Sequence, residues 1–213
     1  MTVISVGRAK HSHELTPSSG NGSKVVYVGF QKTGSTSFGM FFDRLGLRTC
    51  GFRPDFARPN EDLNTQEILK FAEKYDAFQD NPWSILYKEL DLQFPGSKFI
   101  LNIRDSEGWY ESCVKEFGET TIPMRVHIYG IGSPINNKET FVKRYEKHNN
   151  DVLDYFKDRS DDFLQVDLFG DSSQSVSRQI KEFLGKTGPS YEGVGIGHYN
   201  KHRDLPYYEV YRW

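Results

Sequence analysis

The stretch that decides the fold is KVVYVGFQKTGSTSFGMFF, residues 24–42. Residues 25–30 form a continuous apolar run bounded by turn residues, which is typical of a buried central strand. A helix is expected over residues 35–45, because the apolar side chains there recur at helical spacing: Phe38, Phe41, Phe42 and Leu45. Between the two lies a glycine turn that carries Lys32. This order predicts a phosphate-binding loop, because the unpaired N–H groups and the dipole of a helix start favour an anion.

The spacing of this loop differs from that of a nucleoside triphosphate loop, which reads G-x-x-x-x-G-K-[ST]. Gly29 and Gly34 occupy the two glycine positions, but Ser35 stands where the lysine belongs. The lysine comes two residues before the second glycine, in the order QKTGSTS over residues 31–37. A nucleotide kinase on the same fold would also need a carboxylate for magnesium at the end of a strand. Because Ser35 stands in place of the lysine, a nucleotide kinase is the less favoured alternative.

A second motif is KFILNIRDSEGWYES, residues 98–112. An apolar strand over residues 97–103 ends at Arg104, and a helix is expected over residues 106–117. Ser112 follows Arg104 by eight positions and lies within that helix. Both motifs thus place a basic residue just beyond the end of an expected strand.

Together these motifs resemble the sulfotransferases that use 3′-phosphoadenosine 5′-phosphosulfate, whose loop reads roughly K-[ST]-G-[ST]-[ST]. The resemblance extends over roughly residues 24–200 and includes DNP at 80–82, YKEL at 87–90 and YEKH at 145–148. These segments are most similar to a subgroup of small soluble sulfotransferases. It implies transfer of a sulfuryl group to a hydroxyl or amine of a small-molecule or carbohydrate acceptor. A non-catalytic nucleotide-binding protein of the same fold is the other alternative.

The resemblance also implies roles for individual residues. The loop would bind the 5′-phosphosulfate through Gln31, Lys32, Thr33, Gly34, Ser35, Thr36 and Ser37. Arg104 and Ser112 would contact the 3′-phosphate, and a late loop would add Lys201 and Arg203. Lys32 would be catalytic, neutralising charge on the leaving phosphate oxygen. The simpler alternatives are a lysine on a surface turn, and for Arg104 a salt bridge to Asp105 or Glu107.

Asp80 is the candidate base, because relatives carry a histidine or carboxylate at the end of the strand next to the loop. Asp80 would take the proton from the acceptor hydroxyl. It is favoured over His127 and His148. The alternative is that Asp80 caps a helix opening at Pro82, since Asp is a frequent N-cap residue.

Composition limits the class of protein. With 213 residues and 37% hydrophobic residues, the chain suits one domain, expected over residues 24–213 after a flexible tail at 1–23. The net charge of −2 argues against a nucleic-acid partner, and no apolar run is long enough to span a membrane. Two cysteines, Cys50 and Cys113, do not suggest a zinc site, and no metal is expected. A cytoplasmic monomer or homodimer is the expectation.

The remaining pattern alternates strands with helices. Further strands are expected at residues 76–79 and 163–166, and helices at 63–75, from Pro82 to Leu90, at 138–158 and at 173–184. Residues 118–137 carry little periodicity and are expected to form a long functional loop or lid. The whole predicts an α/β domain with three layers, a mainly parallel sheet and the topology of phosphate-loop proteins. Phe52, Phe56 and Tyr129 are candidates for the wall of an acceptor pocket.

Overall fold

A parallel sheet of five strands lies at the centre of the computed structural model, which describes residues 22–197. The strand order is β2-β3-β1-β4-β5. The strands are β1 (Val25–Tyr27), β2 (Thr49–Cys50), β3 (Ala77–Phe78), β4 (Lys98–Asn102) and β5 (Phe163–Val166). All four pairings are parallel, with β1 in the middle of the sheet. The carboxyl ends of all five strands therefore meet at one edge.

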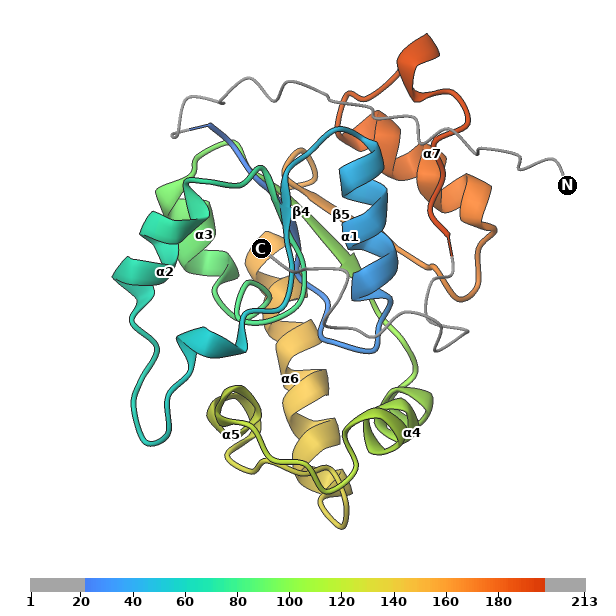
Figure 1. The fold of residues 1–213 in the computed structure, drawn as a ribbon. Helices are drawn as coiled ribbons and strands as arrows, with labels where there is room; N and C mark the ends of the chain where they lie inside the picture. Colours follow the sequence, from blue (N-terminus) through green and yellow to red (C-terminus); the bar gives the residue numbers. More distant parts are fainter. Residues whose placement is uncertain (1–21, 198–213) are drawn as a thin grey trace, which may run out of the picture.

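Helices cover both faces of this sheet, as Figure 1 shows. They are α1 (Ser35–Arg44), α2 (Thr65–Ala72), α3 (Tyr87–Gln93), α4 (Ser106–Phe117), α5 (Pro123–Tyr129), α6 (Lys138–Phe156) and α7 (Ser173–Phe183), with short 3₁₀ turns at Pro54–Phe56 and Pro189–Tyr191. Buried side chains of α1 and α7 pack on one face, and those of α2, α3 and α6 pack on the other. The architecture is three-layered.

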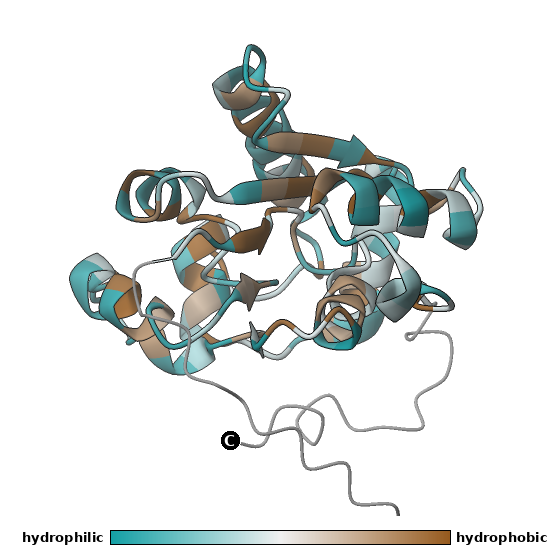
Figure 2. Ribbon diagram, turned by 90° about the horizontal axis from the view of Figure 1, so that it is seen from above, coloured by the Kyte–Doolittle hydropathy of each residue, from teal (hydrophilic) through white to brown (hydrophobic). Residues whose placement is uncertain are grey.

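Alternation along the strands explains the two faces. Val26 and Phe99 point into the core shared with α2, α3 and α6, whereas Tyr27 and Ile100 point into the core shared with α1 and α7. All four side chains are fully buried. Figure 2 shows the apolar colour concentrated on the strands and the polar colour on the outer helix surfaces.

A third apolar cluster lies beyond the carboxyl edge of the sheet, where α4, α5 and α6 meet. Trp109 stacks on Tyr145 with ring centroids 4.2 Å apart, and Tyr129 stacks on Phe141 at 4.0 Å. Phe30, from the loop after β1, joins the same cluster. The loop after β1 therefore packs on a cluster of aromatic rings.

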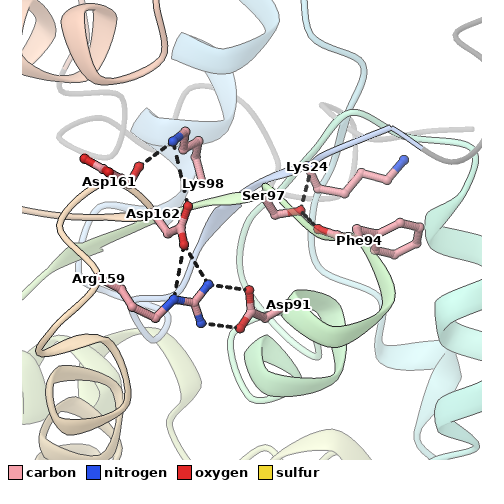
Figure 3. A network of polar contacts seen from close by, with 8 residues as sticks. All are labelled: Lys24, Asp91, Phe94, Ser97, Lys98, Arg159, Asp161 and Asp162. Atoms are coloured by element: carbon pink, nitrogen blue, oxygen red, sulfur yellow. Dashed lines mark hydrogen bonds and ion pairs between the residues drawn. The ribbon is translucent and has the colours of Figure 1, made fainter.

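The amino-terminal edge of the sheet carries a network of paired charges, drawn in Figure 3. Arg159 donates to both oxygens of Asp91, at 2.5 and 2.9 Å, and to Oδ2 of Asp162 at 2.8 Å. Lys98 pairs with Asp162 at 3.9 Å. The network ties α3 to the start of β4 and to the residues that precede β5.

The predicted α/β class and the parallel sheet are confirmed. The helices expected at residues 106–117 and 173–184 are observed as α4 and α7 with bounds within one residue, and the strand at 163–166 is β5. The first strand is shorter than its apolar run, because pairing ends at Tyr27 and the chain turns into the loop. Within residues 22–197, no helix combines the length and apolar character that crossing a bilayer requires.

Two expectations are wrong, and one element was not predicted. The helix placed at Pro82 begins at Tyr87, because residues 82–86 form turns after a cis peptide bond between Asn81 and Pro82. The segment at residues 118–137 is not one long loop, since α5 lies within it and begins with Pro123 at its first turn. The two-residue strand β2 was not predicted, because it pairs only with β3 at the sheet edge.

Candidate active site

The loop between β1 and α1 has the backbone of an anion cradle. Lys32 has a φ of 68° and Gly34 a φ of 101°, so the chain passes twice through the left-handed region. A Cβ at Gly34 would lie 2.8 Å from Leu168 Cδ2, which explains the glycine. Gly34 is also the N-cap of α1 and has no side chain to occupy the helix start. The positive end of the helix dipole therefore faces the cavity in front of this loop.

Buried hydrogen bonds hold the loop from beneath. The Tyr27 hydroxyl donates to the Thr33 carbonyl at 2.9 Å, and Asn102 Nδ2 donates to the same oxygen at 2.7 Å. Asn102 Oδ1 in turn accepts from the Leu168 backbone N–H at 2.8 Å. At Gly29 any Cβ would lie 2.5 Å from the Tyr27 hydroxyl oxygen. The loops after β1 and β5 are thus joined through a side chain of β4.

Gln31 holds the loop against its other neighbours. The Trp109 ring N–H donates to the Gln31 carbonyl at 2.9 Å, and Asn81 Nδ2 donates to Gln31 Oε1 at 2.7 Å. The Gln31 amide N–H donates to the Tyr129 hydroxyl. Both polar atoms of the Gln31 amide therefore bond to protein groups, so this side chain supports the loop. Thr33 likewise points inward, whereas Ser35 and Thr36 line the cavity.

Asp80 follows β3 and lies beside the start of α1. Its Oδ2 accepts from Ser35 Oγ at 3.2 Å, and its Oδ1 accepts from the Asn81 backbone N–H at 2.8 Å. Its φ is 69°. No helix begins at Pro82, and the N-cap residue of α3 is Leu86. The capping role considered for Asp80 is therefore wrong.

The positive φ values single out Lys32. Among residues 22–197, the non-glycine residues in the left-handed region are Lys32, Asn60, Asp80 and Asn136. Asparagine and aspartate adopt this conformation at little cost, but lysine rarely does. Backbone strain of this kind concentrates at functional sites. Lys32 and Asp80 also line one cavity.

That cavity has a volume of about 210 Å³ and is open to solvent. Its polar side comprises Gln31, Lys32, Ser35, Thr36, Asp80, Asn81, Glu116 and Thr120, and its other lining residues are Phe52, Phe117, Ile122, Met124, Arg125 and Ile128. Lys32 Nζ contacts Glu116 Oε2 at 3.1 Å. The side chain of Lys32 is 17% exposed, so the lysine points along the cavity wall and is not on a simple surface turn.

Arg104 lies just beyond the end of β4. Its backbone N–H donates to the Tyr145 hydroxyl at 2.9 Å, and its guanidinium lies 5.3 Å from the ring centre of Phe169. Asp105 instead caps α4 by accepting from the Gly108 N–H at 2.6 Å, and Glu107 pairs with Lys138. The predicted alternative of a salt bridge to these two acids is therefore wrong.

Ser112 lies on α4 one turn after Gly108. The guanidinium of Arg104 lies over Gly108. A Cβ built at Gly108 would lie 3.2 Å from Arg104 Nη2. Ser112 is partly buried. The arginine and the serine therefore belong to one stretch of the helix surface.

Lys32 and Arg104 lie at the same edge of the sheet, because β1 and β4 are parallel neighbours. The thiol of Cys113 reports their proximity. Burial raises the pKa of Cys113 to about 12, while the positive charges of Lys32, Arg104 and Arg125 lower it. One buried group is thus within electrostatic reach of all three cations.

The two histidines lie elsewhere. His148 is buried, bonded through Nε2 to the Val28 carbonyl at 2.7 Å and stacked on Phe30 at 4.0 Å. His127 is exposed near the end of α5 and does not line the cavity. Lys201 and Arg203 lie outside the described residues.

The sequence did not single out Glu116, Asn81 or Arg125. Glu116 lies one turn after Ser112 on α4, a spacing that could have suggested a shared face. Arg125 lies between Met124 and Ile128, whose helical spacing marks a buried face. Of the predicted wall residues, Phe52 lines the cavity, whereas Tyr129 lies in the third cluster.

Comparison with known proteins places this site in a family. A family model described as a sulfotransferase domain matches residues 24–135, which is more than half of the chain. The sulfotransferase domain from the curacin biosynthetic pathway has a similar fold, with a TM-score of 0.55 and 13% identity, over 79% of this chain and 76% of that one. A gluconokinase from Sinorhizobium meliloti 1021 aligns at a TM-score of 0.47 and 14% identity, over 78% and 93% of the two chains. No curated protein matches. The chain belongs to the sulfotransferase domain family.

Proposed function

We propose that the protein is an enzyme that transfers a sulfuryl group from 3′-phosphoadenosine 5′-phosphosulfate to a hydroxyl or amine of a small acceptor. The observation that carries this proposal is the pairing of Lys32 and Asp80. The backbone of Lys32 is strained, and both residues line the cavity in front of the helix start. A cation for the leaving group and a carboxylate for the acceptor proton are what the reaction requires.

The residues present fit the nucleotide at both of its charged ends. The loop and the start of α1 provide donors for the 5′-phosphate side, where Gly34 lets the backbone approach. Arg104, with its planar fork of donors, suits the 3′-phosphate, and Ser112 can add a hydroxyl. The proposal is supported by the strand order, in which β1, before Lys32, and β4, before Arg104, are neighbours.

In the proposed reaction, a bond forms between the acceptor oxygen and sulfur while the bond from sulfur to the 5′-phosphate oxygen breaks. Asp80 accepts the acceptor proton. Lys32 stabilises the negative charge that develops on the departing phosphate oxygen. Ser35 orients Asp80 through the hydrogen bond of 3.2 Å between Ser35 Oγ and Asp80 Oδ2.

The first experiment measures binding of the desulfated nucleotide, adenosine 3′,5′-bisphosphate, in buffer that contains a chelator. A rise in Tm is expected without added magnesium, since a ligand that binds only the folded state stabilises it. Among the residues that the structure describes, no three His, Cys, Asp or Glu side chains are grouped to hold a metal. The absence of any shift at millimolar nucleotide would contradict the proposal.

Two variants separate the roles within the site. Arg104→Ala is expected to weaken nucleotide binding about tenfold to a hundredfold, because a hydrogen bond to a charged group is worth roughly 1.5–3 kcal/mol. Asp80→Asn keeps the size of the side chain and is expected to abolish transfer while leaving the nucleotide-induced Tm shift intact. Arg58→Ala, a surface arginine paired with Glu61, is the control for charge removal. Full activity of Asp80→Asn would exclude Asp80 as the base.

A further inference from the structure

Arg125 is a cation almost completely enclosed in the wall of the cavity. It belongs to α5, and the residue is only 6% exposed. Its guanidinium lies 4.5 Å from the ring centre of Phe117, another wall residue. Apolar surroundings strengthen the attraction of such a charge for an anion, because the local dielectric is low. The arginine is therefore suited to bind a negatively charged group that enters the cavity.

The cavity reaches from Lys32 to residues that follow β2 and β3, and its lining does not include Arg104 or Ser112, the predicted contacts of the 3′-phosphate. Phe52 follows β2 and Asp80 follows β3, and both line it. In the sheet, β3 and β4 flank β1 on opposite sides. A nucleotide that reaches Arg104 from the loop thus extends toward β4. The part of the cavity beyond Lys32, Ser35 and Thr36, with Arg125 in its wall, is left for the acceptor.

The rest of the wall limits the acceptor further. Phe52, Ile122, Met124 and Ile128 give the cavity an apolar surface beside the arginine. Its volume of about 210 Å³, which the acceptor would share with the sulfuryl group at the loop, is below the ~300–1,000 Å³ typical of pockets that enclose drug-sized ligands. The group that enters is therefore small and partly apolar.

We infer that the acceptor is a small hydroxy acid, in which a carboxylate or comparable anionic group binds Arg125 and the hydroxyl faces Lys32 and Asp80. This inference rests on the proposed function for the reaction, but the binding of the anionic group can be measured by itself. An arginine offers a planar set of donors that matches a carboxylate in two-point contact. The neutral amide of the same acid would lose the charge and one acceptor oxygen.

The test compares 4-hydroxyphenylacetate with 4-hydroxyphenylacetamide, two ligands of nearly equal shape. Binding of each is titrated with and without adenosine 3′,5′-bisphosphate. The acid is expected to bind about tenfold more tightly, as a charge-assisted hydrogen bond predicts. Arg125→Gln should abolish this preference and leave amide binding and the nucleotide-induced Tm shift unchanged. Arg125→Lys should keep part of the preference, and Arg58→Gln, at an exposed arginine, should keep all of it.

Several results would overturn the inference. They are equal binding of acid and amide, a preference that survives in Arg125→Gln, the absence of any binding of the acid at millimolar concentration, and loss of the nucleotide-induced shift in Arg125→Gln. Circular dichroism checks that the variants fold. If Arg125→Gln does not fold, Arg125→Lys still tests the inference. Failure of the nucleotide to bind the wild type would count against the proposed function alone, since the acid and amide are also compared without it.

Discussion

At the amino-terminal edge of the sheet charged side chains pair with one another, whereas at the carboxyl edge they line a cavity. Arg159 is shared between Asp91 and Asp162 and joins α3 to the connection between α6 and β5. At the other edge Lys32 and Asp80 adopt left-handed backbone conformations, and Lys32 has one exposed partner, Glu116, among the charges that the structure describes. The first edge thus contributes stability, and the second keeps charge available for a ligand at some cost to stability.

Of the variants that compare the two edges, those at Lys32 are expected to have the largest effect. Lys32→Ala and Lys32→Gly should both lower kcat by about 10²–10³-fold, since each removes the charge that stabilises the leaving group. The glycine variant should nevertheless be more stable than the alanine variant by about 1 kcal/mol, because glycine adopts a φ of 68° without strain. Chemical denaturation and steady-state turnover measure the two quantities.

Asn60→Gly is the matched control for that experiment, since Asn60 has a φ of 60° outside the cavity. It should leave turnover unchanged. If Lys32→Gly and Lys32→Ala were equally stable, the loop would relax on losing the lysine, and the contrast in strain between the two edges would disappear.

Acid should affect the two edges in different pH ranges. Burial lowers the pKa of His148, which supports the loop through the Val28 carbonyl, to about 4. The unfolded chain, with a histidine pKa near ~6.5, binds the extra proton first, so stability falls as the pH drops from ~6.5 towards 4. The loss amounts to roughly 3 kcal/mol. His148→Gln should flatten this part of the curve in urea unfolding, and exposed His127→Gln should not.

The amino-terminal edge responds only at lower pH. Hydrogen bonds from Arg159 lower the pKa of Asp91, so its contribution is present at neutral pH and is lost as the pH falls through that lowered value. If the His148→Gln variant lost stability between pH 6.5 and 4 as steeply as the wild type, another group would govern this range.

The candidate site residues that follow β1 and β4 could be predicted, because the pattern that marks each of them lies within one short segment of sequence. The glycine spacing and the position of Lys32 are properties of one short segment, as is the apolar strand that ends before Arg104. Parallel pairing of β1 and β4 then brings the segments together. The α/β class follows from the same alternation of strands and helices.

The opposite wall of the cavity could not be predicted in this way. Contact between Lys32 and Glu116 depends on how α4 packs, and no spacing along the chain encodes it. Helix α5 was not predicted, because the glycines and prolines of residues 118–137 are a stronger sequence signal than the short apolar face of this helix. The capping role for Asp80 followed from its place before Asn81 and Pro82, but the chain turns there before α3 begins.

A smaller effect is expected at the amino-terminal edge itself. Arg159→Met should lower the free energy of unfolding by about 1–3 kcal/mol, because it leaves the carboxylate of Asp91, 8% exposed, without its main partner. The estimate is below that for a fully buried pair because the Arg159 side chain is 34% exposed. Nucleotide binding should be unchanged. Weakened binding in this variant would show that the two edges are coupled.

The smallest effect is expected at Glu116, the exposed partner of Lys32. Glu116→Gln should tighten nucleotide binding about two- to fivefold, since an exposed ion pair is worth only ~0.2–1 kcal/mol. The phosphates must replace the Glu116 carboxylate beside Lys32. Calorimetry at two salt concentrations measures the change, and the difference from wild type should shrink at the higher salt because exposed charges are screened.

Glu107→Gln is the control on the same helix, since Glu107 pairs with Lys138 at 2.6 Å and does not line the cavity. Weaker binding in Glu116→Gln would reverse the assigned role. Glu116 would then position Lys32 for the nucleotide, and the carboxyl edge would be held by pairing in the same way as the amino edge.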